Sequence, residues 1–283
     1  MSAPLLAVDA PSLLYRAFFA LPKTIVEGEG VPVNALLGSL NIVLRVVAEQ
    51  GPRAVVFCFG PDAAGYRVEL YPAYHAARPE VPEELAPQFA AAPAFFEAFG
   101  WFVETHDSLE ADDLLGSLAA EEAEAGGEAL ILTGDRDLYQ CVDERVRVLY
   151  MKTGSKGPEL VDAAEVRKRY GVAPALVPDF IALRGDPSDG LPGGTGIGDK
   201  TASALLERHG SLEGAIAGAM GERSARVRGA LLDEAEQLRD FREIARLRRT
   251  EVARPPDRGT DFAGGAEAAR ARGMNRLAER LEG

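Results

Sequence analysis

Short apolar runs alternate with segments of helical periodicity through the first half of the chain. The apolar runs predict buried strands at residues 5–8, 54–59, 101–104, 129–132 and 146–150. The segments between them carry apolar residues at helical spacing, which predicts helices at 12–21, 35–49, 89–99 and 111–125. Strands and helices that alternate in this way are typical of an α/β fold with a mostly parallel central sheet covered by helices on both faces.

The pattern changes after about residue 160, where short helices are separated by glycine and proline. The segment GDPSDGLPGGTGIGDK, residues 185–200, is a dense run of turn residues. Helices are predicted after it at 201–209 and 227–247. We therefore expect three parts, which are an α/β core over 1–160, a helical subdomain over 161–250 and a C-terminal tail over 251–283 without an assigned role.

Composition and charge narrow the class of protein. The hydrophobic fraction of 47% is sufficient for a sizeable core, and no run of about 18 apolar residues predicts a membrane span. Cys58 and Cys141 lie in apolar surroundings, and the N-terminus lacks a signal-peptide pattern, so a cytoplasmic protein without disulfides is expected. A net charge of −13 argues against a nucleic-acid binder unless the acids are gathered at a metal site.

Acidic residues gather in four short segments at strand ends and turns. They are Asp9, then Glu110, Asp112 and Asp113 in LEADD, Asp135 and Asp137 in TGDRD, and Asp186 and Asp189 in GDPSDG. Because the carboxyl ends of parallel strands meet at one edge of the sheet, several of these side chains should lie close together. Any one of them is explained equally well as a helix cap or a turn residue.

Carboxylates at this density repel one another unless cations neutralise them. Mg²⁺ and Mn²⁺ prefer oxygen ligands, and two such ions in neighbouring sites can activate water and stabilise the leaving oxygen in phosphodiester cleavage. The four segments together therefore predict a site for two divalent metal ions.

A glycine-rich turn, GGTGIGDK, leads into the helix predicted at 201–209. Gly196, Ile197 and Gly198 allow a close backbone approach, and the free N–H groups at a helix start favour phosphate. Lys200 adds a positive charge just inside that helix. This is the layout of a helix-hairpin-helix module, which holds a DNA backbone without reading its sequence. Tight packing of helices is the alternative explanation of the glycines.

Taken in order, these motifs resemble the 5′-nuclease family, which includes bacterial flap endonucleases and the 5′-nuclease domain of bacterial DNA polymerase I. The resemblance covers about residues 4–250 and rests on VDAPSLLYRAFFALP, YRVELYPAYHAAR, EADDLLGSLA, ILTGDRDLYQ, ALRGDPSDGLPG and GIGDKTASALL. It implies a PIN-like α/β core, a helical arch at about 66–92 and a helix-three-turn-helix subdomain. No polymerase domain follows these motifs, so a free-standing enzyme is expected.

The resemblance also implies an activity and a role for each acid. The activity is metal-dependent hydrolysis of DNA at a 5′ flap or 5′ end, as flap endonuclease and 5′-3′ exonuclease in replication and repair. The first metal ion is expected on Asp9, Glu110 and Asp112. The second is expected on a larger group, which consists of Asp113, Asp135, Asp137, Asp186 and Asp189.

Contacts to DNA follow from the same resemblance. Arg67 and Arg78 match residues that contact phosphates near the scissile bond, and Tyr74 matches an aromatic residue that stacks on a base. The turn at Gly196 is expected to bind duplex backbone together with a K⁺ ion. The expected partner is DNA with a 5′ flap or 5′ end at a duplex junction, bound by a monomer that works at the nucleoid and not at a membrane.

Two positions depart from the family pattern. Gly60 stands where an aspartate is expected, so the first metal site should be weakened, and Gly60→Asp should tighten metal binding unless Asp62 supplies the lost ligand. His75 stands where the family has a lysine near the transition-state phosphate. If His75 takes that catalytic role, activity should rise as the pH falls and the imidazole gains its proton; an ordinary, partly exposed histidine is the alternative.

Three classes of function remain open at this point. A structure-specific 5′ nuclease is the first, and a DNA-junction binder with weak or lost catalysis is the second. The retained acids argue against a pure binder, since a field that repels phosphate gives it no advantage. A metal-dependent phosphatase on an unrelated α/β fold is the third, and it leaves the turn at Gly196 unexplained.

Overall fold

A mostly parallel sheet forms the centre of the computed structural model, which describes residues 3–28, 30–152 and 157–283. Within these residues the sheet has six strands in the order β3-β2-β1-β4-β5-β6. The strands are β1 (Leu5–Asp9), β2 (Ala54–Phe59), β3 (Phe102–Thr105), β4 (Ala129–Thr133), β5 (Val146–Tyr150) and β6 (Glu159–Val161). Among the strand pairs of this sheet in the described residues, only β5–β6 is antiparallel. The predicted fold class is confirmed, and β6 is the strand that the apolar pattern missed.

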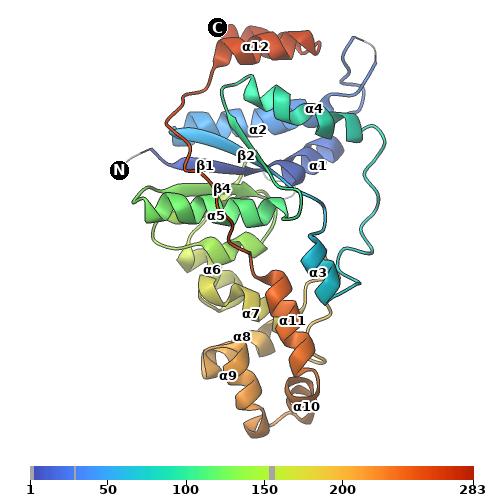
Figure 1. Cartoon of the computed structure of the whole chain (residues 1–283), viewed down its shortest axis with the longest axis vertical. Coiled ribbons are helices and arrows are strands. Elements are labelled where there is room, and N and C mark those ends of the chain that lie inside the picture. Colours follow the sequence, from blue (N-terminus) through green and yellow to red (C-terminus); the bar gives the residue numbers. More distant parts are fainter. Residues whose placement is uncertain (1–2, 29, 153–156) are drawn as a thin grey trace.

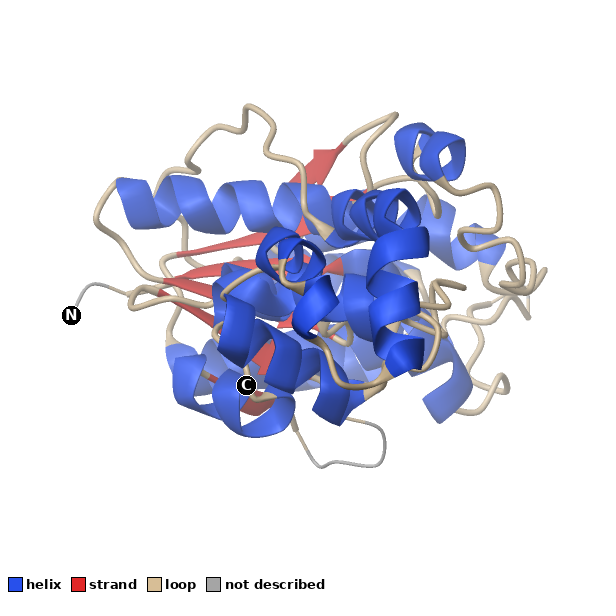
Figure 2. Ribbon diagram, turned by 90° about the horizontal axis from the view of Figure 1, so that it is seen from below, coloured by secondary structure: helices blue, strands red, loops and turns tan. Residues whose placement is uncertain are grey.

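Helices cover both faces of the sheet because successive strand residues point to opposite sides. On β1, Leu6 and Val8 belong to the core shared with one group of helices, α1 (Ala10–Ala20), α2 (Asn34–Gln50) and α4 (Ala86–Glu97). On the same strand, Leu5 and Ala7 belong to the core shared with α5 (Ala111–Glu124). Figure 2 shows the strands between these two layers of helices.

The register of the sheet brings the strand ends to one edge. Asp9 at the end of β1 is paired with Cys58 in β2, so Gly60 follows on the neighbouring strand at nearly the same level. On the other side, Val8 is paired with Leu132, so Thr133 lies beside Asp9. The segments that leave β1, β2 and β4 therefore start from a common edge.

A helical part follows the sheet. Its helices are α6 (Ala163–Tyr170), α7 (Val177–Arg184), α8 (Asp199–His209), α9 (Leu212–Ala217), α10 (Ala225–Asp233) and α11 (Ala235–Ala245). The single helix predicted over 227–247 is wrong, because it is divided at Glu234 into α10 and α11. The side chain of Glu234 accepts a hydrogen bond from the N–H of Thr195 at 2.9 Å, a tertiary contact that local periodicity does not contain.

The C-terminal segment returns from the helical part to the α/β core. Figure 1 shows it leaving α11 as an extended red trace and reaching α12 at the opposite end of the molecule. Helices α12 (Phe262–Ala271) and α13 (Asn275–Glu282) bury Ala266, Ala269 and Ala278 in the same core as Phe95 and Phe99. The tail is thus part of the folded core rather than an appendage.

The predicted arch begins with the short helix α3 (Gly65–Leu70) and ends in α4. Residues 71–85 between them form turns and extended chain. No helix in the described part of the chain is long and apolar enough to cross a membrane.

Candidate functional site

One cavity of about 800 Å³ lies at the carboxyl edge of the sheet. All of the predicted acids line it except Asp113, and these are Asp9, Glu110, Asp112, Asp135, Asp137, Asp186 and Asp189. They come from the ends of β1 and β4, the start of α5 and the turn after α7. Segments that are more than 170 residues apart in the sequence therefore contribute carboxylates to a single cavity.

Asp9 is fixed in place by the start of α1 and by β4. Its Oδ1 accepts a hydrogen bond from the Ser12 N–H at 3.0 Å, so it is an N-cap of α1, and its Oδ2 accepts one from the Thr133 hydroxyl at 2.6 Å. Burial raises the pKa of Asp9, and the bonds from Thr133 and Ser12 partly oppose that rise. Sequence reasoning missed Thr133, although its place at the end of β4 could have indicated it.

Four carboxylates of the cavity lack a positive partner among the described residues, and one of them, Asp9, has only the neutral donors Ser12 and Thr133. Asp112, Asp135 and Asp137 form no ion pair with any of the described residues. Burial raises the pKa of Asp135 to about 7, and the charge of Asp189 adds to that rise. Burial also raises the pKa of Asp112 and of Asp137 well above the usual range, and in both cases the charge of Asp135 adds to it. Uncompensated carboxylates of this kind favour protons or metal cations.

The turn after α7 supplies the remaining two acids. Asp186 accepts hydrogen bonds from the N–H and hydroxyl of Ser188 and pairs with Arg184, whose Nη2 lies 3.1 Å from Oδ2. Asp189 Oδ1 lies 3.0 Å from Arg78 Nη2 and 3.1 Å from His75 Nε2. Sequence reasoning did not single out Arg184, which also lines the cavity and directly precedes the acidic turn.

Glu110 is buried and held from three sides. Its Oε1 accepts a hydrogen bond from the Ala64 N–H at 2.8 Å and lies 2.8 Å from Arg67 Nη1. The Tyr74 hydroxyl donates to Oε2 at 3.1 Å. Glu110 precedes α5, whose first turn also carries Asp112 and Asp113. Successive helix residues point in different directions, which separates Asp112 from Asp113.

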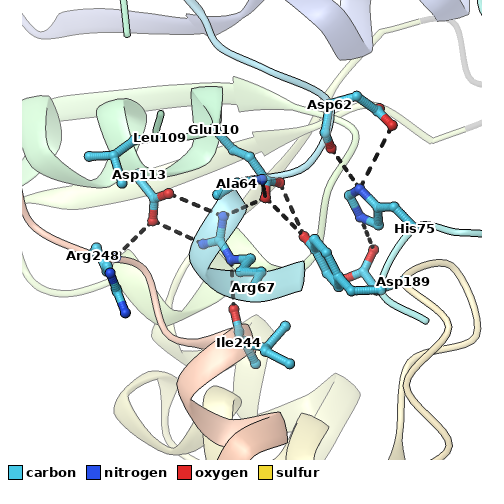
Figure 3. A network of polar contacts seen from close by, with 12 residues as sticks. Asp62, Ala64, Arg67, His75, Leu109, Glu110, Asp113, Asp189, Ile244 and Arg248 are labelled. Atoms are coloured by element: carbon cyan, nitrogen blue, oxygen red, sulfur yellow. Dashed lines mark hydrogen bonds and ion pairs between the residues drawn. The ribbon is translucent and has the colours of Figure 1, made fainter. Parts of the chain in front are cut away.

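Asp113 and Arg67 are paired with each other in the interior of the protein. Asp113 is fully buried outside the cavity, and its two oxygens accept hydrogen bonds from Arg67 at 2.9 and 3.1 Å. Figure 3 shows Arg67 directed at Asp113, Glu110 and Ile244. Asp113 does not line the cavity, whereas Arg67 does, but the Arg67 side chain is only 3% exposed and is paired with Asp113 and Glu110.

Tyr74 and His75 are also occupied by protein partners. Their rings stack at 3.8 Å, and Tyr74 is buried with its hydroxyl on Glu110, so one face of the ring is not available to a base. His75 Nδ1 lies 2.6 Å from the carbonyl oxygen of Asp62, and its Nε2 faces Asp189 (Figure 3). Both ring nitrogens of His75 therefore contact protein oxygens. His75 is buried, so the prediction of a partly exposed histidine is wrong.

Gly60 lines the cavity, but the backbone around it leaves no room for a side chain. A Cβ atom built there would collide with the carbonyl oxygen of Leu109 and would lie 2.8 Å from the backbone nitrogen of Ala111. The chain entering α5 passes directly over Gly60, so an aspartate does not fit this backbone. Asp62 is exposed, and its Oδ1 lies 3.2 Å from Arg78 Nη1.

The glycine-rich turn leads into α8 as predicted, and it follows α7, a helix that the sequence pattern did not predict. Gly193 and Gly196 adopt positive φ, and a Cβ at Gly193 would collide with the backbone of Arg184. Gly198 precedes α8 and is exposed, as is Lys200, whereas the side chain of Ile197 is buried. The side chain of Ile197 is therefore not available to a ligand, and its N–H already donates to the carbonyl oxygen of Gly194 at 2.9 Å.

The chemistry of the cavity fits divalent metal ions. All of its candidate ligands are carboxylate oxygens, which Mg²⁺ and Mn²⁺ prefer. Among the residues that the structure describes, no three acidic, histidine or cysteine side chains are spaced to hold one ion by themselves. Mg²⁺ retains several water ligands, so one or two carboxylates for each ion are sufficient.

Comparison with known proteins assigns the chain to a family. Two family models match adjacent parts of it, the 5′-3′ exonuclease N-terminal resolvase-like domain over residues 4–171 and the 5′-3′ exonuclease C-terminal SAM fold over residues 172–257. This chain belongs to the 5′-3′ exonuclease family, a family of nucleases, as its motifs predicted.

Curated relatives agree with this assignment. A 5′-3′ exonuclease of Mycobacterium tuberculosis is 38% identical over 249 residues, which is 81% of this chain and 78% of the relative. The thermostable DNA polymerase I of Thermus thermophilus is 39% identical over 277 residues, which is 98% of this chain but 32% of the polymerase. The chain is thus similar along nearly its whole length to about one third of that polymerase.

Solved structures show the same fold. The T5 D15 protein co-crystallised with metal ions has a TM-score of 0.71 at 15% identity, and the alignment covers 99% of this chain and 98% of that one. The catalytic core of Rad2 in complex with a DNA substrate has a TM-score of 0.64 at 14% identity, with 99% and 91% covered. At these identities the likeness establishes the fold alone.

Proposed function

We propose that this protein is a structure-specific 5′ nuclease that hydrolyses DNA phosphodiesters with divalent metal ions, as a flap endonuclease and 5′-3′ exonuclease. The observation that carries the proposal is the cavity at the strand ends, into which four chain segments bring carboxylates without enough positive partners. Two comparisons support it: a solved structure with the same fold was co-crystallised with metal ions, and a relative of similar sequence is a 5′-3′ exonuclease.

Two groups of acids are proposed to hold the metal ions. Asp9, Glu110 and Asp112 form the first, and Asp135, Asp137, Asp186 and Asp189 form the second; Asp113 is left out because Arg67 occupies it. Ions bound there would activate a water molecule and neutralise charge on the leaving oxygen. They would also reverse the local negative field that otherwise repels a phosphate backbone.

The chain's own contribution to the DNA is divided between two surfaces. Arg78 lines the cavity and is 36% exposed on its side chain, so it is the basic residue that we assign to the phosphate near the cut. His75 and Tyr74 hold Asp189 and Glu110 instead of meeting the DNA. The turn at Gly196–Gly198 with Lys200 is proposed to bind duplex backbone, with K⁺ as the ion of that turn, and the protein is proposed to act as a monomer.

A cleavage assay on a labelled 5′-flap duplex tests the proposal. The wild-type protein should cut the flap with Mg²⁺ or Mn²⁺ and lose activity in a chelator. Asp112→Asn and Asp135→Asn should lower the rate by at least about 100-fold, since each removes a ligand charge in the cavity. Asp107→Asn is the matched control, because Asp107 is exposed, lies just before Glu110 and does not line the cavity.

Two results would contradict the proposal. Tight binding of the flap duplex without cleavage by the wild type would identify a junction binder. Cleavage confined to a simple phosphomonoester would identify a phosphatase.

A further inference from the structure

We propose that the buried Arg67–Asp113 pair is a positioning device that couples the seating of the helical subdomain to the placement of Glu110 in the cavity. The inference rests on the proposed nuclease function, because its consequence is measured as a cleavage rate. It assigns neither residue to the metal ions or the DNA.

Arg67 joins three parts of the molecule through one guanidinium. Its Nε donates to the carbonyl oxygen of Ile244 at 2.9 Å, in the last turn of α11. Its Nη1 lies 2.8 Å from Glu110 Oε1, and Nη1 and Nη2 both donate to Asp113. Figure 3 shows these contacts converging on Arg67. A planar fork with fixed donors holds such partners in a defined geometry.

Asp113 extends the connection to the C-terminal segment. Its Oδ1 also accepts a hydrogen bond from the backbone N–H of Arg248 at 2.7 Å. The Arg248 guanidinium lies 3.3 Å from the centre of the Tyr66 ring, next to Arg67 in α3. Asp113 therefore joins the start of α5 to the chain that leaves the helical subdomain.

Helix α3 itself packs on α11. Tyr71 and Phe241 meet edge to face with their ring centres 5.2 Å apart, and Phe241 is fully buried. A displacement of α11 would therefore carry both the Ile244 carbonyl and the Arg67 backbone with it. Glu110 is bound to the same guanidinium, so its carboxylate would move relative to Asp9 and Asp112.

Burial makes this connection stiff. The side chains of Arg67 and Asp113 are 3% and 0% exposed, so neither charge can turn to water when its partner is lost. Removing one partner of such a pair is strongly destabilising, because it leaves an uncompensated charge. Displacement of a reacting group by about 1 Å can cost about 100-fold in rate. The position of α11 therefore determines, through this pair, where Glu110 lies in the cavity.

Asp113→Asn is the decisive variant, since it retains the shape of the side chain and removes its charge. We expect the single-turnover cleavage rate at saturating DNA and saturating Mg²⁺ to fall about 10- to 100-fold. The Kd for the flap duplex, measured in a chelator, should stay unchanged. The Mg²⁺ concentration for half-maximal rate should also stay unchanged. Arg67→Lys, which retains charge but not the planar fork, should show the same split.

Glu122→Gln is the matched control. Glu122 is 1% exposed and forms ion pairs with the largely buried Arg53 and the exposed Arg254, which fix the same C-terminal segment at a distance from the cavity. It should lower the midpoint of thermal unfolding, as Asp113→Asn does, but leave the single-turnover rate of the folded protein unchanged. If Asp113→Asn does not fold, the double variant Arg67→Met with Asp113→Leu removes both charges together and gives the same readout.

Each other outcome overturns the inference. Recovery of Asp113→Asn at high Mg²⁺ would make Asp113 a metal ligand, and a raised Kd with an unchanged rate in Arg67→Lys would make Arg67 a phosphate contact. If Asp113→Asn lost stability but cleaved DNA at the same single-turnover rate as Glu122→Gln, the pair would have a purely structural role. An inactive wild-type protein would instead refute the proposed function, so the two failures are distinguishable.

Discussion

The carboxylates of the cavity differ in whether they form an ion pair with an arginine. Glu110 and Asp189 have arginine partners, whereas Asp112, Asp135 and Asp137 form no ion pair with the described residues. Like charges that are packed together without compensation are the condition under which a cation binds most favourably. The residues without partners therefore indicate where the cations should lie, and the paired acids Glu110 and Asp189 are expected to complete the two groups of ligands.

At position 60 the close approach of the backbone before α5 leaves room only for glycine. Gly60→Asp should lower the stability of the protein by about 1–3 kcal/mol, because its Cβ meets the backbone at Leu109 and Ala111. The Mg²⁺ dependence of cleavage should not improve. Thermal unfolding is the measurement, and Gly65→Ala is the control, since a Cβ at Gly65 enters open space. Tighter metal binding in Gly60→Asp would restore the expectation drawn from the sequence.

Helix α8 and the turn before it form the element that we assign to duplex DNA. The turn is held by buried contacts, so its exposed backbone has little freedom to lose on binding. Lys200 lies in the first turn of α8, where the positive end of the helix dipole adds to its charge. Arg208 lies in the last turn of the same helix and forms an ion pair with Glu222.

Because Arg208 is paired with Glu222 at the far end of α8, removing the charge of Lys200 and removing that of Arg208 should affect duplex binding differently. Lys200→Ala should weaken duplex binding and reduce the slope of log K against log salt by about one, because one phosphate contact is lost. Arg208→Ala should change neither quantity. Cleavage at saturating DNA should be the same in both variants. Equal losses in affinity would mean that only the total charge of the helix matters.

The whole molecule carries an excess of negative charge, and some of its acids are buried together in the cavity. Its net charge is −13, and burial together with neighbouring acids raises the pKa of Asp135 to about 7. Between about pH 4 and 7, Asp135 is ionised in the unfolded chain but keeps its proton in the fold. The folded state then binds more protons, so its stability falls as the pH rises through this window and stays lower above it.

Asp135→Asn should remove this fall in the metal-free protein. The variant should have a higher melting temperature than the wild type at pH 8 but not at pH 4, because the carboxyl group of Asp135 loses a proton between these pH values and the amide of asparagine does not. Mg²⁺ at pH 8 should raise the melting temperature of the wild type more than that of the variant. Differential scanning calorimetry in a chelator, with and without Mg²⁺, measures both differences. An equal shift at the two pH values would contradict the assigned cause.

Much of the fold was available from local patterns. Apolar runs identified every strand except β6, which has only three residues and one fully buried position. The acids at the ends of β1 and β4 were identified because parallel strands end at one edge. The break at Glu234 and the packing of α12 on the core were not available, since both depend on contacts between distant segments.

The sequence by itself determined the α/β class, the family and the acids that line the cavity, because these depend on periodicity and on motifs in a fixed order. Only the tertiary structure decided which charged groups remain free. Arg67 and Asp113 face each other, His75 lies between Asp62 and Asp189, and the chain before α5 covers Gly60. Those outcomes depend on burial and on partners that lie far away in the chain, which a reading of local motifs does not contain.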